Sequence, residues 1–181
     1  MIEKKFTLAG AGLVGSLFAI YLAKKGHRVD VFERRKDMRL EIIGAGKSIN
    51  LALSNRGWKA LAGVGIDDEV KQMGIPMYKR VMHALDGTLT DQAYGKDGEA
   101  IYSVSRGGLN SLLMDLAERE DKVNIHFNKK CVDVNLKEAS STFEDVVTKE
   151  ITKVEADHLV GADGIYSAVR TQMQRQDRFN Y

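Results

Sequence analysis

The sequence predicts an α/β fold that contains a parallel βαβ unit, an antiparallel hairpin and a small β-meander. Residues 6–9 form a short apolar run, residues 13–25 repeat apolar side chains at helical spacing, and residues 27–33 alternate as a strand does. Two strands that are joined through one helix run parallel, and such crossovers are right-handed. The first 33 residues therefore predict the start of a parallel sheet.

The middle of the chain interrupts this pattern. Ser54 is placed to cap a short helix, and Asp67 and Gly74 bracket another. Residues 79–85 and 88–94 then flank Asp86-Gly87, a dipeptide that tolerates the positive φ angles of a two-residue hairpin turn. We therefore expect an antiparallel hairpin between the two α/β parts of the chain.

The α/β pattern resumes after the hairpin. Ser105 is placed to cap a helix whose leucines recur at i, i+3, i+4 and i+7, which predicts a buried stripe of Leu109, Leu112, Leu113 and Leu116. A strand is expected at 123–127, and a meander of three alternating strands at 131–136, 143–148 and 150–155. A last strand at 158–162 precedes Asp163-Gly164 and a final helix that begins near Ser167.

The composition argues against several classes of function. The 27 Lys and Arg residues nearly balance the 25 Asp and Glu residues, so we expect no nucleic-acid partner. Cys131 is the only cysteine and is interpreted as a small buried residue, and no two histidines have the i+3 or i+4 spacing of a helical metal site, so no metal is expected. No apolar run approaches the roughly 20 residues that span a bilayer. We expect a cytoplasmic segment without membrane contact.

Three glycines carry the clearest chemical signal. Gly10, Gly12 and Gly15 form G-x-G-x-x-G between the predicted strand and helix. In such a motif the first glycine permits a tight turn, the second lets a pyrophosphate approach the backbone, and the third allows helix and strand to pack closely. Glu33 ends the second strand, 18 residues after Gly15, where a carboxylate accepts hydrogen bonds from an adenosine ribose. Together they predict a dinucleotide site in a Rossmann-like fold.

The residues after Glu33 bear on which dinucleotide binds. Arg34 and Arg35 follow the second strand, where arginines can hold the 2′-phosphate of NADP. Glu33 would repel that phosphate, so FAD or NAD is favoured. The alternative for the two arginines is a solvated surface without a ligand.

A second motif is V-G-A-D-G-I-Y-S-A-V-R, which spans 160–170. Asp163 at the strand end can accept hydrogen bonds from a ligand or organise the loop. Gly164, which has no side chain, gives the backbone there greater conformational freedom. Arg170 can pair with a phosphate or hold Asp163. The alternative is an ordinary helix start that is capped by an aspartate.

The order of these motifs resembles the class A flavoprotein monooxygenases, which are aromatic hydroxylases. Within that group, G-K-S-I-N-L-A-L-S-N-R-G (46–57), G-I-P-M-Y-K-R-V-M-H (74–83) and Y-S-V-S-R-G-G-L-N (102–110) are specifically similar to the kynurenine 3-monooxygenase family. The likeness runs from Phe6 to Tyr181. It implies an enzyme that uses FAD, NADPH and O2 to hydroxylate L-kynurenine to 3-hydroxykynurenine.

The resemblance also implies roles for individual residues. The FAD site would comprise Gly10, Gly12, Val14, Gly15, Glu33, Arg34, Arg35, Ala52 and Arg106. Asp163, Gly164 and Arg170 would contact FAD and the pyrophosphate of NADPH. Arg80 would pair with the carboxylate of the substrate, and Tyr94 would donate its hydroxyl to the same ligand. No catalytic side chain is expected, because the flavin supplies the reactive oxygen.

Members of the kynurenine 3-monooxygenase family are longer than this chain. The resemblance therefore implies that 1–78 and 99–181 form a discontinuous FAD-binding domain, incomplete at its C-terminus, and that 79–98 is a hairpin of the substrate domain. Residues 1–181 alone are expected to lack hydroxylase activity. Two alternatives stay open: another FAD- or NAD-dependent oxidoreductase, and a non-catalytic FAD-binding fragment. The oligomeric state is not predicted.

Overall fold

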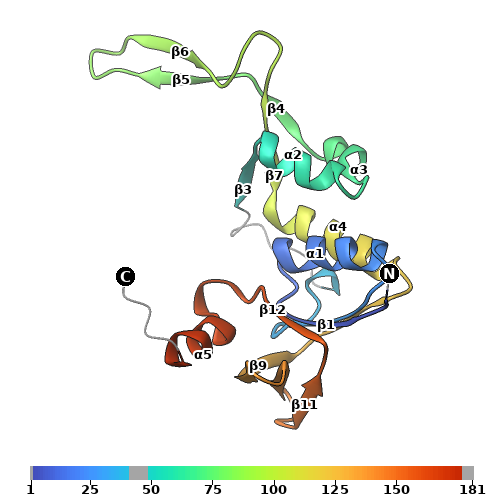
Figure 1. Cartoon of the computed structure of the whole chain (residues 1–181). Coiled ribbons are helices and arrows are strands. Elements are labelled where there is room, and N and C mark those ends of the chain that lie inside the picture. Colours follow the sequence, from blue (N-terminus) through green and yellow to red (C-terminus); the bar gives the residue numbers. More distant parts are fainter. Residues whose placement is uncertain (1, 41–48, 177–181) are drawn as a thin grey trace. The chain divides into compact units, whose positions relative to one another are not determined.

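The computed structural model describes residues 2–40 and 49–176 (Figure 1). Two compact units divide the chain. We call Met1–Ile43 with Asn110–Tyr181 the sheet unit, and Gly44–Leu109 the hairpin unit. Gly46, Lys47 and Ser48, which begin one of the family-like motifs, lie outside the described residues.

The sheet unit contains a four-stranded parallel sheet. Its strands stand in the order β12-β1-β2-β8, and each neighbouring pair is parallel. They are β1 (Lys5–Ala9), β2 (Arg28–Phe32), β8 (Val123–His126) and β12 (His158–Gly161). The helix α1 (Leu13–Lys24) connects β1 to β2, and η1 (Met38–Leu40) follows β2. The predicted parallel βαβ unit is therefore confirmed.

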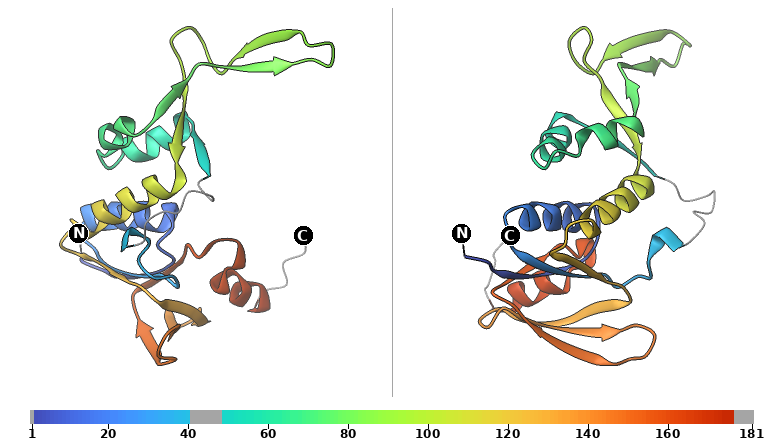
Figure 2. Two further views of the ribbon diagram at one scale, coloured as in Figure 1. Left: turned by 180° about the vertical axis from the view of Figure 1, so that it is seen from behind. Right: turned by 90° about the vertical axis from the view of Figure 1, so that its right-hand side faces the viewer.

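The sheet is covered on both faces, as parallel sheets generally are. Figure 2 shows α1 and the part of α4 (Arg106–Glu118) that belongs to the sheet unit on one face, with the meander on the other. Leu8, Val29 and Val31 on the central strands are buried, and so is Ile20 on α1. The apolar alternation of β1 and β2 therefore supplies the core that positions the loops at the strand ends.

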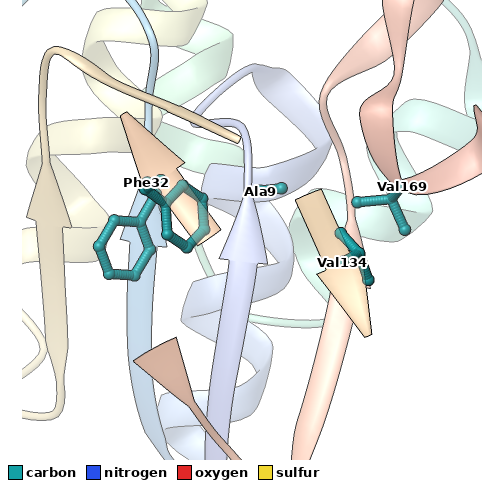
Figure 3. Packing of buried hydrophobic residues seen from close by; sticks show 5 residues of the cluster. Ala9, Phe32, Val134 and Val169 are labelled. Carbon is teal, nitrogen blue, oxygen red and sulfur yellow. The ribbon is translucent and has the colours of Figure 1, made fainter. Parts of the chain in front are cut away.

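The meander packs through aromatic rings. Its antiparallel strands stand in the order β11-β10-β9 and are β9 (Lys129–Asn135), β10 (Ser140–Asp145) and β11 (Ile151–Glu155). Phe143 of β10 stacks on Phe32 of β2 with ring centroids 4.0 Å apart. These two residues join Ala9, Val134 and Val169 in one buried cluster (Figure 3). Val169 lies on α5 (Ala168–Gln176), which follows η2 (Gly164–Tyr166).

The hairpin unit is a separate small α/β body. Its three-stranded antiparallel sheet has the order β3-β7-β4, and β5 pairs with β6 in an antiparallel hairpin. The elements are β3 (Asn50–Leu53), α2 (Asn55–Ala62), α3 (Asp67–Gln72), β4 (Ile75–Met77), β5 (Lys79–His83), β6 (Leu89–Ala93) and β7 (Ile101–Ser105). Trp58 of α2 meets Tyr102 of β7 edge to face at 5.0 Å.

Some local details differ from the sequence predictions. The hairpin turn has three residues, not two, because Ala84 and Thr88 still pair and Gly87 donates to the Ala84 carbonyl at 3.0 Å. Gly87 takes a positive φ of 86° and Asp86 does not, as in a type I turn that ends in a left-handed residue. Ser54 precedes α2 but makes no side-chain capping hydrogen bond.

The helix after Ser105 agrees more closely with its prediction. The Ser105 hydroxyl accepts the Gly108 N–H at 3.2 Å, so the predicted cap is confirmed. Leu109, Leu113 and Leu116 are buried, whereas Leu112 is only half-buried.

Candidate functional site

The predicted nucleotide motifs lie at the carboxyl ends of parallel strands. Gly10 directly follows β1 and Glu33 directly follows β2. Asp163 comes two residues after the end of β12. Because β12, β1 and β2 are parallel neighbours, their carboxyl ends meet at one edge of the sheet, where ligands of open α/β sheets bind. A pocket of about 60 Å³ opens at this edge and is lined by Ala9, Gly10, Phe32, Glu33, Arg34, Lys129, Lys130, Cys131, Asp163, Tyr166 and Ala168.

The glycine loop has the geometry that its motif predicts. Gly10 has a φ of 102°, and a Cβ there would lie 2.5 Å from the Ala162 carbonyl oxygen. A Cβ on Gly15 would lie 1.9 Å from the Gly10 carbonyl oxygen. A Cβ on Gly12 would meet nothing within 4 Å, so this residue borders open space. Gly10 and Gly15 are thus required by packing, while Gly12 leaves room beside the backbone.

The N-terminus of α1 is suited to an anion. The Ser16 N–H donates to the Gly12 carbonyl at 2.9 Å, so the amides of Leu13, Val14 and Gly15 precede that bond in the first turn. The Gly12 cap position has no side-chain hydrogen bond, and the first turn contains no acidic residue. Val14 is 73% exposed. Amides and helix dipole together favour a negative group here.

The Glu33 carboxylate accepts hydrogen bonds from two backbone amides. One oxygen accepts the Ala11 N–H at 3.0 Å, and the other accepts the Arg35 N–H at 3.0 Å. A carboxylate has about four lone-pair positions, so it retains capacity for further donors such as ribose hydroxyls. Arg34 and Arg35 are exposed, and Arg34 also lines the pocket.

Asp163 combines a satisfied and an unsatisfied oxygen. Its Oδ2 accepts the Ala168 N–H at 2.7 Å, which caps the start of α5. Its Oδ1 is buried and has no hydrogen-bond partner within 2–40 and 49–176. A buried acceptor of this kind calls for an explanation, and a ligand donor is one. Gly164 follows with a φ of 79°.

Arg170 stabilises the loop after Asp163 and does not pair with that carboxylate. Its guanidinium donates to the carbonyls of Gly164, at 3.2 Å, and of Ile165. The side chain is exposed at the start of α5. Of the two roles that the sequence left open, a contact with Asp163 is therefore not observed.

Sequence reasoning missed several residues that line the pocket. Lys129, Lys130 and Tyr166 carried no prediction; Lys129 and Lys130 are the first two residues of β9, a strand that was predicted to begin only at Cys131. Cys131 was interpreted as a small buried residue; it is half-buried and lines the pocket. Burial and the nearby charges of Asp163 and Asp133 raise the pKa of the Cys131 thiol to about 12. This thiol is therefore protonated at neutral pH.

The hairpin unit contains the other four predicted residues. Ala52 is exposed on β3 opposite Ser103, and Arg106 is the exposed first residue of α4. Arg80 of β5 donates from Nε to Gln92 Oε1 of β6 at 2.7 Å. The Tyr94 N–H donates to the Tyr78 carbonyl at 3.0 Å, which continues the ladder. With Arg80 opposite Gln92, this register brings Arg80, Gln92 and Tyr94 to one face of the hairpin.

A wider pocket of about 380 Å³ lies in the hairpin unit, beside Trp58 and Tyr102. None of the predicted site residues lines it. Across the part of the chain that the structure describes, no three His, Cys, Asp or Glu side chains are grouped to hold a metal ion. No helix among those residues is both long and apolar enough to cross a bilayer. The expected cytoplasmic location stays a prediction.

Comparison with known proteins identifies the family. A family model described as "FAD binding domain" matches residues 5–179. The chain belongs to this family of FAD-binding domains. The predicted preference for a flavin dinucleotide is thereby confirmed at the level of the domain.

Curated relatives of this FAD-binding domain are named kynurenine 3-monooxygenase. The protein of Christiangramia forsetii is 50% identical over 99% of this chain and 40% of its own length. That of Flavobacterium johnsoniae is 49% identical over 98% of this chain and 39% of its length, and that of Anopheles gambiae 43% over 96% and 36%. The resemblance to this family is confirmed, and the chain spans about two fifths of the length of these relatives.

Solved structures support the fold of the FAD-binding domain. The tetrameric form of 2-methyl-3-hydroxypyridine-5-carboxylic acid oxygenase matches with a TM-score of 0.77 and 25% identity, covering 96% of this chain and 43% of that one. The flavin-dependent monooxygenase PieE, in complex with FAD and substrate, matches with a TM-score of 0.79 at 21% identity, over 95% and 32% of the two chains. The predicted Rossmann-like α/β fold is confirmed.

Proposed function

We propose that this FAD-binding domain is part of a flavin-dependent monooxygenase that uses NADPH and O2 to hydroxylate L-kynurenine to 3-hydroxykynurenine. The observation that carries the proposal is the 40–50% identity, across nearly the whole chain, to relatives named kynurenine 3-monooxygenase. The geometry of the glycine loop and of the hairpin supports it at the level of residues.

The diphosphate of FAD is proposed to lie over Gly12 and the first turn of α1. Support comes from the open space beside Gly12, the exposure of Val14 and the amides that precede the first intrahelical hydrogen bond. These groups bind an anion through partial positive charge without a charged side chain. Gly10 and Gly15 hold the loop in the required shape.

The ribose of the adenosine half is proposed to contact Glu33. Its carboxylate has acceptor capacity beyond the two backbone amides that it already holds. A negative group here disfavours the 2′-phosphate of NADP, which agrees with FAD as the dinucleotide. Arg34, Arg35, Ala52 and Arg106 are proposed to lie along the same cofactor, as the family resemblance implies.

Asp163, Gly164 and Arg170 are proposed to serve FAD and the pyrophosphate of NADPH. The unpartnered buried Oδ1 of Asp163 supports a ligand donor at this position. Because Arg170 donates to two loop carbonyls, its proposed contribution is to fix the loop, and a guanidinium has three further N–H groups that can meet a phosphate.

L-kynurenine is proposed to bind through Arg80 and Tyr94. A guanidinium offers a carboxylate two parallel hydrogen bonds, and Gln92 fixes the orientation of this one. All strand residues of β5 and β6 are exposed, and a two-stranded hairpin is marginal by itself. This supports the proposal that 79–98 belongs to a larger substrate domain, while 1–78 and 99–181 form the FAD-binding domain.

FAD, when bound, supplies the redox chemistry that activates oxygen. The residues of this chain are left with binding and orientation: the glycine loop and Glu33 fix the cofactor, and Arg80 with Tyr94 fixes the substrate. The aniline amine of kynurenine activates its own ring toward hydroxylation. The proposal therefore requires no acid or base from this segment.

The decisive experiment is a titration of the complete purified protein with L-kynurenine, followed by its visible spectrum and by NADPH oxidation and O2 uptake. We expect a flavin spectrum that kynurenine perturbs, and stimulation of both rates. A flavin spectrum with hydroxylation of a phenol instead would keep the flavin assignment and reject the substrate. A bound flavin without any turnover would favour a non-catalytic FAD-binding protein.

A further inference from the structure

Ala11, the middle residue of G-A-G, is fixed through both of its peptide groups. Its N–H donates to Glu33 Oε2 at 3.0 Å. Its carbonyl oxygen accepts the Ser16 hydroxyl at 3.2 Å and the side-chain amide of Asn110, through Nδ2, at 3.3 Å. Ala11 is only 1% exposed. Three side chains, from the end of β2, from α1 and from α4, therefore converge on one residue of the glycine loop.

The two hydrogen bonds to the Ala11 carbonyl set the direction of the next amide. The Ala11 carbonyl and the Gly12 N–H belong to one planar trans peptide, so they point in opposite directions. Ser16 and Asn110 draw the carbonyl toward the interior, and the Gly12 N–H consequently points the other way. A glycine in this position has little steric preference of its own, so the orientation depends on what holds the carbonyl.

Apart from its hydrogen bond to the Ala11 carbonyl, the side-chain amide of Asn110 is poorly satisfied. The second Nδ2 contact of Asn110 is to Met38 Sδ at 3.3 Å, and sulfur is a weak acceptor. Asn110 Oδ1 is buried and lacks a hydrogen-bond partner in the described part of the chain. A buried acceptor without a partner destabilises a folded protein, and an apolar side chain of the same size would avoid that cost.

We propose that Ser16 and Asn110 are positioning residues, which clamp the Ala11 carbonyl so that the Gly12 N–H is presented to the diphosphate of FAD. Neither side chain contacts the ligand in this scheme. The inference rests on the proposed binding of FAD by the glycine loop. It gives a role to the last residue of the Y-S-V-S-R-G-G-L-N motif, which the family resemblance left without one.

The test compares two ligands that differ in the diphosphate. ADP and adenosine are used as competitors against FAD on the complete apoprotein, and the Kd of FAD is measured by quenching of flavin fluorescence. The variant Asn110→Leu removes the donor and keeps the size. Met38→Leu is the matched control, because it removes the other Nδ2 contact and leaves the Ala11 carbonyl bound.

For Asn110→Leu we expect the Kd of FAD and of ADP to rise about tenfold or more, the range of one hydrogen bond to a charged group. Adenosine binding should change less than about twofold, and Met38→Leu should bind all three ligands as the wild type does. Ser16→Ala removes a single hydroxyl with little risk to folding. It should also weaken the binding of ADP and leave the binding of adenosine nearly unchanged.

Equal weakening of ADP and adenosine, or unchanged ADP binding in both Ser16→Ala and Asn110→Leu, would overturn the clamp. If Asn110→Leu does not fold, the Ser16→Ala comparison decides alone. A wild-type protein that binds no FAD would reject the proposed function itself, which separates the two failures.

Discussion

The carboxylate of Glu33 accepts the backbone N–H of Ala11 at 3.0 Å, although 22 positions separate the two residues in the sequence. This bond ties the end of β2 to the glycine loop that follows β1. The other carboxylate oxygen accepts the Arg35 N–H, so the same side chain also shapes the turn after β2. Glu33 therefore organises the proposed site before any ligand binds.

Replacing Glu33 by Gln should weaken FAD binding and lower stability. The amide keeps one acceptor oxygen but turns an NH2 donor toward the Ala11 or the Arg35 amide, and it removes the charge that ribose hydroxyls would meet. We expect a loss of about 1–3 kcal/mol in binding, measured by flavin fluorescence, with a fall in Tm of a few degrees. Glu3→Gln, which alters an exposed pair with Arg28, is the control. Unchanged FAD affinity in Glu33→Gln would contradict the assignment.

Gly12 and Gly15 should respond differently to an added methyl group. A Cβ on Gly12 meets open space, so Gly12→Ala should fold with a nearly unchanged Tm and yet bind FAD more weakly. A Cβ on Gly15 would lie 1.9 Å from the Gly10 carbonyl oxygen, so Gly15→Ala should lose roughly 2 kcal/mol or more of stability. Thermal unfolding of both apoproteins checks this. Equal loss of stability in the two variants would show that Gly12 is also required by packing.

Cys131 should be a poor nucleophile in the folded protein. With a pKa of about 12, the thiolate fraction at pH 7.5 is on the order of 1 in 10,000 or lower. We expect alkylation by iodoacetamide to be at least about 100-fold slower than after unfolding in guanidinium, followed by mass spectrometry. Asp163→Asn removes one of the charges that raise this pKa and should speed alkylation. A folded-state rate equal to the unfolded rate would refute the shift.

The parts of the fold that depend on local periodicity could be predicted from the sequence. The βαβ unit was predicted because apolar residues at 6–9 and 27–33 fill a sheet that is buried on both faces. The meander was predicted with its strand order, although its strand ends differ by a few residues. β3, β4 and β7 were not predicted, because most of their side chains are exposed or half-buried and the alternating signal is weak.

The residues of the candidate site likewise fall into those that local sequence patterns predict and those that depend on tertiary packing. Gly10, Gly15, Glu33 and Asp163 could be found because glycines that permit a tight turn or close packing, and acids that follow a strand, form recognisable patterns in the sequence. The hydrogen bonds of Ser16 and Asn110 to Ala11 form no such pattern, since they join residues up to 99 positions apart. Such contacts follow from the packing of α4 and α1 and not from local propensity.

Acid should remove the contribution of Asp30 to stability. The hydrogen bond from His126 Nε2, at 3.0 Å, lowers the pKa of the Asp30 carboxyl below its ordinary value near 4. A lowered pKa stabilises the fold above the ordinary value, and this stabilisation is lost as the pH falls through the lowered one. Asp30→Asn should therefore reduce stability at pH 6, by less than about 1 kcal/mol because the pair is partly exposed, and the difference in Tm from the wild type should shrink as the pH falls below about 4. If the difference in Tm between Asp30→Asn and the wild type stays the same from pH 6 to pH 3, ionisation of Asp30 does not account for it.

Arg80 should matter for the substrate and not for the cofactor. In the complete protein, Arg80→Ala should raise the KM for L-kynurenine by roughly 10- to 100-fold, the range of a lost charge-assisted pair, while the Kd of FAD stays within about twofold. Gln92→Leu leaves the guanidinium in place but removes the acceptor that orients it, so KM should rise by a smaller factor. Steady-state NADPH oxidation measures both variants.

Lys79 provides the matched control for this prediction. It is the neighbouring cation on β5, it pairs with Asp91, and the alternation of the strand directs it to the opposite face of the hairpin from Arg80. Lys79→Ala removes the same charge from the same strand, so any long-range electrostatic effect on an anionic substrate should be similar in the two variants. If the KM of Lys79→Ala rises as much as that of Arg80→Ala, charge and not contact explains the effect. If neither KM changes, the hairpin face of Arg80, Gln92 and Tyr94 is not the substrate site, and the carboxylate of kynurenine must find its cation elsewhere.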